Sequence, residues 1–261
     1  MKIVFFGNDS DFSKEIFLTL LKLQNRKKVD IVFAVNTEII RNKFIKRLIS
    51  CFIKKVFNPF DECTTSLVYK YFTDYVDNEK LLQTNKLNDK DFIAKIKNYD
   101  ADYAIVAGCG IIFKKELLSS FRIGVVNYHN SLLPKYKGLG GESLPFYFNE
   151  PNFGYTFHFM TENIDDGNII HQKEIKIDTT KSLKHHHKIL LKTLSTEVII
   201  VVDKLLNKEI GFQQKKIDSY FGKKEIKKLQ EVISLDNHSY DELKNVIKCF
   251  GSFLYKGKKN H

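Results

Sequence analysis

Short runs of consecutive apolar residues alternate with amphipathic stretches over most of the chain. Residues 2–6 (KIVFF) and 29–35 (VDIVFAV) are nearly continuous apolar runs, which are typical of strands buried on both faces. Between them, a loop at 7–13 offers several N-cap residues and is followed by apolar residues at helical spacing. A strand, a helix and a second strand in this order predict a right-handed βαβ unit.

The same alternation continues through the middle of the chain. Residues 88–100 (NDKDFIAKIKNYD) predict a short helix that begins at Asn88, with Asp91 placed to support its first turn. Further strands are expected at 103–106, 123–128, 155–160 and 169–177, and helices at 113–121 and 182–206. The pattern predicts an α/β fold with a Rossmann-like, doubly wound and mostly parallel sheet.

Three loops fall at the carboxyl ends of predicted strands, at residues 7–13, 107–112 and 127–142. Ligands of doubly wound sheets bind beyond these ends, so the loops are the first places to seek a site. A dinucleotide site would need G-x-G-x-x-G after the first strand, but only Gly7 and NDSDFS stand there. NAD binding is therefore disfavoured, and the glycines of the third loop are expected to serve turns.

The length of 261 residues allows one main domain and a small appendage. The character of the chain changes near residue 207, so we expect a main domain at 1–207 and a short C-terminal extension at 208–261. A hairpin near 211–221 is the candidate interface of a homodimer. The four cysteines are far apart and contain no C-x-x-C pair, which favours neither a zinc site nor a disulfide framework.

The formal net charge of +11 favours an anionic partner in general terms. Much of the excess is lysine in a sequence rich in Lys, Ile and Asn, a bias that a low-GC genome produces without selection for binding, so the charge carries little weight. The apolar run at the N-terminus is too short for a signal peptide or a membrane span. We therefore expect a cytoplasmic protein without integral membrane association.

Two further stretches invite functional readings. Residues 41–57 form a basic amphipathic pattern, which suits either a helix on an anionic membrane or, more often, a helix packed on the sheet. His185, His186 and His187 are adjacent on a predicted helix, where their side chains point about 100° apart and do not converge on one metal ion. A solvated helix face is expected for these histidines.

The stretch VVNYHNSLLPKYKGLGGE at 125–142 places an amide and an imidazole where a strand meets a loop. A later strand carries His158 and is followed by a loop with Asp165 and Asp166, closed by Gly167. A neighbouring carboxylate orients a histidine and favours its protonated form. Together these groups suit acyl transfer through a tetrahedral intermediate, although spacing alone is equally compatible with residues that cap turns.

The pattern N-x-H-x-S-L-L-P-x-Y-x-G at 127–138, with D-x-G at 165–167 after the strand that carries His158, closely resembles the signature of the 10-formyltetrahydrofolate-dependent formyltransferases. The opening KIVFFGNDSDFS matches more weakly, and AGCGII at 107–112 resembles the folate-binding segment of that family. The resemblance covers roughly residues 1–205. It implies an enzyme with the formyltransferase fold.

The resemblance implies a role for each residue of the motif. Asn127 and a protonated His129 would donate hydrogen bonds to the developing formyl oxyanion. Asp165 would raise the pKa of His129 and, through a water, take the proton lost by the attacking amine. The co-substrate implied is 10-formyltetrahydrofolate, with no metal. Its pterin would contact mainly backbone groups of Cys109, Gly110, Ile111 and Ile112, with Ile164 beside them.

The acceptor depends on which branch of the family the chain resembles. A methionyl-tRNA formyltransferase usually carries a substantial C-terminal barrel, and a glycinamide ribonucleotide transformylase usually opens with a glycine- and serine-rich phosphate loop. The stretch SYFGKK at 219–224 is similar to one in nucleotide-sugar N-formyltransferases, which often form dimers. We therefore expect a nucleotide-linked amino deoxysugar as acceptor. The implied substrate contacts are Asn8, Ser10, Tyr220, Lys223 and Lys224, although solvated lysines beside a packed aromatic ring explain the last three equally well.

Alternatives remain open on the sequence. One is a methionyl-tRNA formyltransferase-like enzyme with a reduced C-terminal domain, and another is a folate- or nucleotide-sugar-binding protein without catalysis. Nucleic-acid binding is disfavoured because no clustered aromatic and basic groove is apparent. The stretch GLGGESLPFYF departs from the continuation common in the relatives, so the resemblance does not define the acceptor pocket near 142–147.

Overall fold

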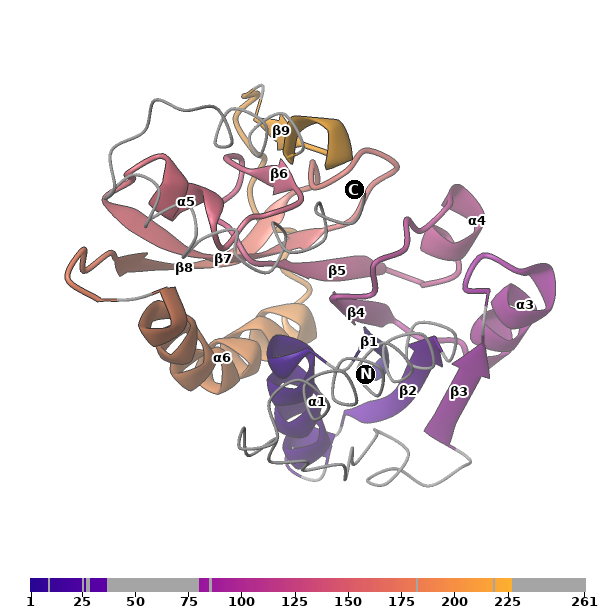
Figure 1. Cartoon of the computed structure of the whole chain (residues 1–261). Coiled ribbons are helices and arrows are strands. Elements are labelled where there is room, and N and C mark those ends of the chain that lie inside the picture. Colours follow the sequence, from indigo (N-terminus) through magenta and orange to yellow (C-terminus); the bar gives the residue numbers. More distant parts are fainter. Residues whose placement is uncertain are drawn as a thin grey trace, which may run out of the picture. The chain divides into compact units, whose positions relative to one another are not determined.

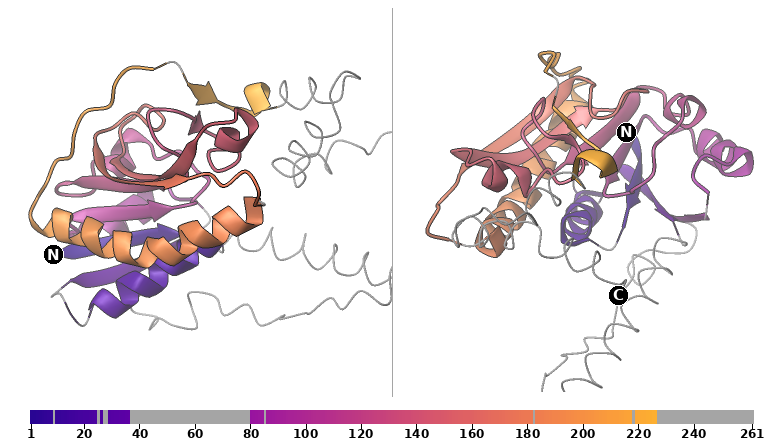
Figure 2. Two further views of the ribbon diagram at one scale, coloured as in Figure 1. Left: turned by 90° about the vertical axis from the view of Figure 1, so that its left-hand side faces the viewer. Right: turned by 45° about the horizontal axis from the view of Figure 1, so that its top comes forward.

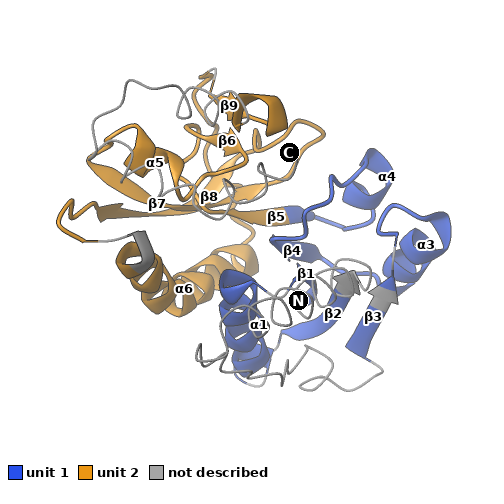
Figure 3. Cartoon of the chain, in the orientation of Figure 1, with its two compact units in different colours: residues 1–125 blue, residues 126–261 orange. Residues whose placement is uncertain are grey.

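The computed structural model describes residues 1–8, 10–24, 26, 29–36, 80–84, 86–181, 183–217 and 219–226 (Figure 1). The chain divides into two compact units, residues 1–125 and 126–261, which Figure 3 colours separately. The basic amphipathic segment at 41–57 lies outside the described residues, so neither reading of it is tested. In the described part of the chain, no helix is long and apolar enough to cross a membrane.

The first unit contains a parallel sheet. Its strands lie in the order β3-β2-β1-β4, and each neighbouring pair is parallel. Their bounds are β1 (Lys2–Gly7), β2 (Asp30–Asn36), β3 (Leu81–Thr84) and β4 (Tyr103–Ala107). The helices of this unit are α1 (Asp11–Gln24), α3 (Lys90–Tyr99) and α4 (Lys115–Leu118). The predicted βαβ unit is confirmed by β1, α1 and β2.

Aromatic side chains from both faces of β1 form the core of the first unit. Phe5 contacts Phe17 and Phe33, with ring centroids 6.3 and 6.2 Å apart. Phe6, on the opposite face, meets Phe113 edge to face at 5.0 Å. Alternate residues of a strand point to opposite faces, so β1 is apolar on both. The continuous apolar run in the sequence has this physical origin.

The start of α3 differs from the prediction. Asp89, not Asn88, is the N-cap, and its carboxylate accepts from the backbone N–H of Asp91 at 3.0 Å. The side chain of Asn88 instead donates to the carbonyl of Ile112 at 3.0 Å and accepts from the N–H of Lys114 at 2.9 Å. Asn88 therefore ties down the end of the loop after β4, and a carboxylate satisfies the helix N-terminus.

The second unit contains antiparallel strands. β5 (Gly124–His129), which spans the division between the units, pairs with β7 (Asn152–Phe159), and β7 pairs with β8 (Ile169–Lys176). In β5 and β7, Asn127 lies opposite His158, and His129 lies opposite Thr156. Residues directly opposite one another share a face of the sheet. The two strands therefore gather four polar side chains on one face.

The other face of these strands is apolar. Tyr128 packs against Tyr155 and Phe157, with ring centroids 5.5 and 5.4 Å apart. The long helix α6 (Leu183–Leu206) covers this face, and the hydroxyls of Tyr155 and Thr193 lie 2.9 Å apart. Figure 2 shows α6 on one side of the second unit's strands, with β6 (Lys137–Gly138), β9 (Tyr220–Phe221) and α5 (Leu144–Tyr147) on the other.

The three adjacent histidines are not all solvated as predicted. His186 is fully buried, accepts from the backbone N–H of Asp178 at 3.0 Å and packs against the rings of Phe146 and Phe153. His187 is half-buried, and its Nδ1 lies 2.7 Å from a carboxylate oxygen of Glu142. The expectation is wrong for His186 because this residue begins the buried helical stripe that continues at Leu190 and Leu194.

The residues after α6 cross to the other side of the second unit, as Figure 2 shows. The backbone of Phe212 pairs with Ile169 of β8, and β9 pairs in parallel with β6. Described residues 211–217 and 219–221 therefore form two separate pairings with earlier strands, not the predicted hairpin. The proposed homodimer interface and the boundary at residue 207 stay predictions.

Candidate active site

The loop after β5 is held against the sheet by a buried threonine. Thr156 donates its hydroxyl to the carbonyl of Ser131 at 2.7 Å and accepts from the N–H of Leu133 at 3.0 Å. The side-chain amide of Gln172 donates to the carbonyl of Leu133 at 2.7 Å. Because Thr156 lies directly opposite His129, the same strand pair fixes both the imidazole and the loop that follows it.

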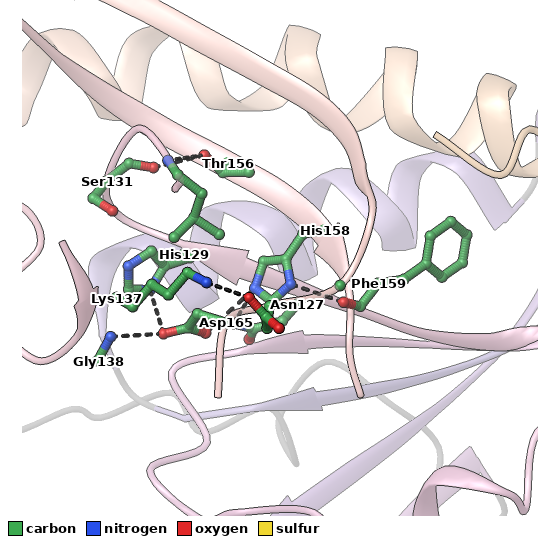
Figure 4. Close-up of polar contacts among 12 residues, drawn as sticks. Asn127, His129, Ser131, Lys137, Gly138, Thr156, His158, Phe159 and Asp165 are labelled. Atoms are coloured by element: carbon green, nitrogen blue, oxygen red, sulfur yellow. Dashed lines mark hydrogen bonds and ion pairs between the residues drawn. The ribbon is translucent and has the colours of Figure 1, made fainter. Parts of the chain in front are cut away.

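His129 is buried and contacts one partner with each ring nitrogen. Its Nε2 lies 2.9 Å from the carbonyl oxygen of Tyr136. Its Nδ1 lies 3.5 Å from Oδ2 of Asp165 (Figure 4). A carbonyl oxygen only accepts, so the proton of the neutral ring belongs on Nε2. That tautomer leaves the lone pair of Nδ1 beside the carboxylate.

Asp165 stands in the loop after β7 with its carboxylate turned back toward the strands. Its Oδ2 accepts from the backbone N–H of Gly138 at 2.8 Å, and its Oδ1 lies 3.4 Å from Nε2 of His158. The φ of 51° at Asp165 is in the left-handed region, which Asp tolerates better than most residues. Any side chain at position 167 would overlap the carbonyl of Phe159, so this tight turn requires Gly167.

His158 connects the amide and the acid. Its Nδ1 donates to the carbonyl of Phe159 at 2.9 Å, which leaves Nε2 of the neutral ring as an acceptor. Nδ2 of Asn127 lies 3.2 Å from that Nε2 and donates to it. This contact fixes which way the Asn127 amide points. The sequence predicts His158 on a strand but gives it no role, and the strand register that places it opposite Asn127 identifies one.

The electrostatics of the cluster differ from one expectation. Burial acts to raise the pKa of Asp165. The contacts with His158, the charge of His129 and the N–H of Gly138 outweigh burial and lower the pKa to about 2. Burial lowers the pKa of His129 and outweighs the opposing effect of Asp165. Asp165 thus raises the pKa of His129 as expected, but the net shift is downward, because removing the imidazolium from water costs more than the carboxylate returns.

The neighbouring carboxylate is directed elsewhere. Asp166 forms an ion pair with the ammonium of Lys137, whose side chain is 11% exposed. The side chain of Asp166 is 45% exposed, whereas that of Asp165 is 11% exposed. Of the two adjacent acids, Asp165 therefore faces the histidines, while Asp166 neutralises a largely buried lysine.

The predicted folate-binding segment lies in the first unit. The thiol of Cys109 is buried, and burial raises its pKa to about 12, so it stays neutral. Gly110, with φ of 66°, has open space where a Cβ would stand, and Ile112 is 64% exposed. The accessible parts of the loop are thus backbone and one apolar side chain, which fits the predicted recognition of a pterin by backbone groups.

Asn8 organises the loop after β1. Its side chain donates to the carbonyl of Gly108 and accepts from the backbone N–H of Ser10, the latter at 2.9 Å. The hydroxyl of Ser10 accepts from the N–H of Ser13 at 3.3 Å. Both side chains thus have contacts inside the first unit, and the prediction that they touch substrate remains untested.

The remaining predicted contacts are on the surface of the second unit. Tyr220 is 46% exposed and Ile164 is 40% exposed, and the side chains of Lys223 and Lys224 are exposed. Their roles in binding substrate and folate stay predictions. Among the described residues, no group of three histidine, cysteine, aspartate or glutamate side chains is arranged to hold a metal ion.

The fold and the site together define an α/β protein with a buried imidazole, a partly buried amide and a partly buried carboxylate near the ends of adjoining strands. The sequence profile of the family described as "Formyl transferase" matches residues 1–203. The chain belongs to this family, as its motif predicted.

Individual relatives agree with this membership. A methionyl-tRNA formyltransferase of Clostridioides difficile is 36% identical over 39% of this chain and 33% of its own length. One from Sulfurimonas denitrificans is 27% identical over 91% of this chain and 70% of its own. Three relatives that are 32% to 36% identical are matched over only 33% to 42% of their own length.

Solved structures of sugar-modifying relatives have the same fold. A sugar N-formyltransferase from Shewanella superposes with a TM-score of 0.66 at 16% identity, covering 96% of this chain and 88% of that one. An N-formyltransferase from Helicobacter canadensis, solved with folinic acid and dTDP-3-aminofucose, gives 0.61 at 19% identity, covering 95% and 80%. The predicted α/β formyltransferase fold with a mostly parallel sheet is confirmed.

Proposed function

We propose that the protein transfers a formyl group from 10-formyltetrahydrofolate to the amino group of a nucleotide-linked amino deoxysugar. The observation that carries the proposal is the cluster of Asn127, His129 and Asp165, in which Nδ1 of His129 lies 3.5 Å from the carboxylate. The cluster combines a hydrogen-bond donor, a proton acceptor and a buried negative charge. These are the groups that attack of an amine on a carbonyl carbon requires.

The folate co-substrate supplies the formyl carbon that the acceptor amine attacks. Nδ2 of Asn127 donates a hydrogen bond to the formyl oxygen as that oxygen gains negative charge. His158 orients the amide before substrate arrives, since its Nε2 lies 3.2 Å from Nδ2. A preorganised donor of this kind lowers the barrier because it needs no reorganisation during the reaction.

His129 moves the proton that the amine loses. Burial lowers its pKa, so the resting ring is neutral and Nδ1 is free of a proton. Nδ1 accepts the amine proton, and the resulting imidazolium is stabilised by the adjacent Asp165, whose pKa of about 2 keeps it ionised. The proton then passes to the nitrogen from which the formyl group departs. In this role the resting ring is neutral, in place of the protonated His129 that the resemblance implies.

Two kinds of acceptor have specific support. Of the two solved structures, one is a sugar N-formyltransferase and the other is an N-formyltransferase solved with dTDP-3-aminofucose. The sequence relatives named above are methionyl-tRNA formyltransferases, which makes methionyl-tRNA the second candidate. The amino sugar is favoured because described residues 207–217 and 219–226 fold back onto strands β6 and β8 of the second unit.

The test is a direct competition between acceptors. The protein is incubated with 10-formyltetrahydrofolate and, in parallel, with TDP-, UDP- and GDP-linked 3-amino or 4-amino sugars and with charged methionyl-tRNA. We expect one nucleotide sugar to gain the mass of a single carbonyl group. Formylation of methionyl-tRNA alone would contradict the sugar proposal and leave the formyl transfer standing. Transfer to none of these acceptors would contradict both.

A further inference from the structure

The residues after α6 contact both loops of the candidate site. Residues 211–217 and 219–221, here named the strap, follow the stretch that the family profile matches, residues 1–203. The strap begins at a pair of backbone hydrogen bonds between Phe212 and Ile169, 2.9 and 2.8 Å long. It ends where Tyr220 pairs with Lys137 in β6. Between these anchors it passes the loop that carries Asp165.

Gln214 is the point at which the strap grips the Asp165 loop. Its side-chain amide donates to the carbonyl of Asp165 at 3.0 Å and to the carbonyl of Gly167 at 2.7 Å. Both amide hydrogens are thus used, and a flipped amide would place its oxygen against two carbonyl oxygens. The two bonds span the left-handed turn at Asp165, whose backbone they hold in place.

Gln214 is turned inward, unlike its immediate neighbours in the strap. It is 9% exposed, whereas the side chains of Gln213, Lys215 and Lys216 are exposed. Its Oε1 is buried and has no hydrogen-bond partner among the described residues. A buried, half-satisfied amide is a poor choice for stability alone. Its two donated bonds instead hold the backbone of the turn that carries Asp165.

The C-terminal end of the strap fixes the backbone groups that contact His129 and Asp165. Ser219 accepts from the N–H of Tyr136 at 2.8 Å, and its carbonyl accepts from the N–H of Lys137 at 2.8 Å. The carbonyl of Tyr136 accepts a hydrogen bond from Nε2 of His129. Gly138, which follows Lys137, donates its backbone N–H to Asp165. Each catalytic side chain is therefore one hydrogen bond away from a backbone group that the strap fixes.

We propose that the strap positions the catalytic groups, with Gln214 as the positioning residue that sets the carboxylate of Asp165 against His129. This inference rests on the proposed formyl transfer for its effect on rate. It assigns to residues beyond the matched part of the chain a function inside the active site. Gln214 itself touches neither substrate nor the reacting atoms.

The test compares paired substitutions at neighbouring positions. Gln214→Met keeps the length of the side chain and removes both donors, and Gln214→Glu also places a charge against two carbonyl oxygens. Gln213→Met and Gln213→Glu make the same changes on the exposed neighbour. We expect kcat to fall by up to about 10²-fold in the Gln214 variants, because a small misplacement of a catalytic group has effects of this size. KM for the acceptor and both Gln213 variants should change little.

A second readout follows the imidazole directly. Asp165 raises the pKa of His129 against the effect of burial, so a displaced carboxylate should lower that pKa further in Gln214→Met, as seen by NMR titration of the ring. If Gln214→Glu does not fold, Gln214→Met decides. Wild-type kcat and an unchanged His129 titration in Gln214→Met would overturn the proposal, as would an equal loss in the Gln213 variants.

The two readouts separate this inference from the proposed function. Should the wild-type protein transfer no formyl group to any acceptor, the proposed function fails, and the titration of His129 in the Gln214 and Gln213 pairs still decides whether the strap sets the geometry. If the wild type transfers the formyl group, and Gln214→Met shows a normal rate and a normal His129 titration, the proposed function stands. The strap then has no part in it.

Discussion

The strands of the two units place polar residues differently. In the first unit, β1 and β4 are apolar and buried on both faces apart from the exposed Lys2 that begins β1, and polar groups gather in the loops that follow these strands. In the second unit, β5 and β7 are apolar on the face toward α6 and polar on the other, where Asn127 and His158 face each other. The first arrangement builds a core, and the second builds a core and a reactive site on the same backbone.

The difference shows how a rigid site arises. Side chains on paired strands have their spacing set by the register, and the hydrogen bonds of the ladder hold that register. The first unit holds its loops instead by single side chains, such as Asn8 and Asn88. The amide of Asn127 and the two imidazoles thus lie on strands, and the groups expected to contact a flat ring through backbone lie on a loop.

The largest expected effect comes from the apolar face. Phe157→Ala should lower the free energy of unfolding by about 3–5 kcal/mol, because it removes a fully buried ring that packs on Tyr128 and Tyr155. Denaturant unfolding measures this loss. The folded fraction should keep its kcat. A variant as stable as the wild type would show that this face does not form the core of the second unit.

On the polar face, Asn127→Ala should lower kcat by about 10²–10³-fold, which is the usual effect of removing one donor to a developing oxyanion. The free energy of unfolding should change far less than in Phe157→Ala. Steady-state kinetics with the acceptor that the competition experiment selects measures the first, and denaturant unfolding measures the second. The exposed His185 of α6 provides the control, since His185→Ala should keep both values. A loss of stability without loss of rate would make this face a structural one.

Thr156→Val tests the link between the strand pair and the loop after β5. The substitution keeps the shape of the side chain but leaves the carbonyl of Ser131 and the N–H of Leu133 without their partner. A buried unpaired group of this kind costs about 1–3 kcal/mol. Both the free energy of unfolding and kcat should fall, because the loop after β5 also carries the carbonyl that orients His129. Loss of stability with unchanged kcat would separate the loop from catalysis.

The pH dependence of stability gives a smaller effect of known sign. The pKa of His129 in the folded protein lies below its ordinary value of 6.5, so the stability it contributes is present above pH 6.5 and is lost as the pH falls through that value toward the lowered pKa. For Asp165 the loss begins near 3.8 and is complete only below about 2. Unfolding of wild type and His129→Gln above and below pH 6.5 should show a shallower slope in the variant. Equal slopes would contradict the lowered pKa.

The smallest effect is expected at the surface of the second unit. Lys135 pairs with Glu150 at 2.7 Å, but its side chain is 51% exposed. Exposed pairs contribute about 0.2–1 kcal/mol, so Lys135→Ala should change the free energy of unfolding by no more than this and should leave kcat unaltered. A larger change in either value would extend the site to the outer side of the loop after β5.

Much of the architecture could be predicted from the sequence. The runs at β1, β2 and β4 are short, nearly continuous and apolar, as is typical of strands buried on both faces, and the predicted parallel pairing is confirmed. The Asn127, His129 and Asp165 motif was found because its spacing matches a known signature. Two local predictions were wrong. Asp89, not Asn88, caps the helix. His186 is buried and not solvated, as the helical stripe through Leu190 and Leu194 already indicated.

Other features could not be read from the sequence. The lowered pKa of His129 depends on how deeply the ring is buried, and no pattern of residue types reports that depth. The contact between Gln214 and Asp165 joins positions 49 residues apart and depends on the path of the strap. A glutamine in a polar segment carries no signal of its own, so only the folded chain identifies it.

The central claim is that a single buried carboxylate, placed against His129, enables formyl transfer. It is tested most directly by the transfer rate of Asp165→Asn beside that of Asp166→Asn, since the two acids are adjacent and face different partners. We expect Asp165→Asn to lose about 10²–10⁴-fold in kcat, as for a group that takes part in proton transfer, and Asp166→Asn to lose far less. Equal rates in the two variants, or a wild-type rate in Asp165→Asn, would contradict the account.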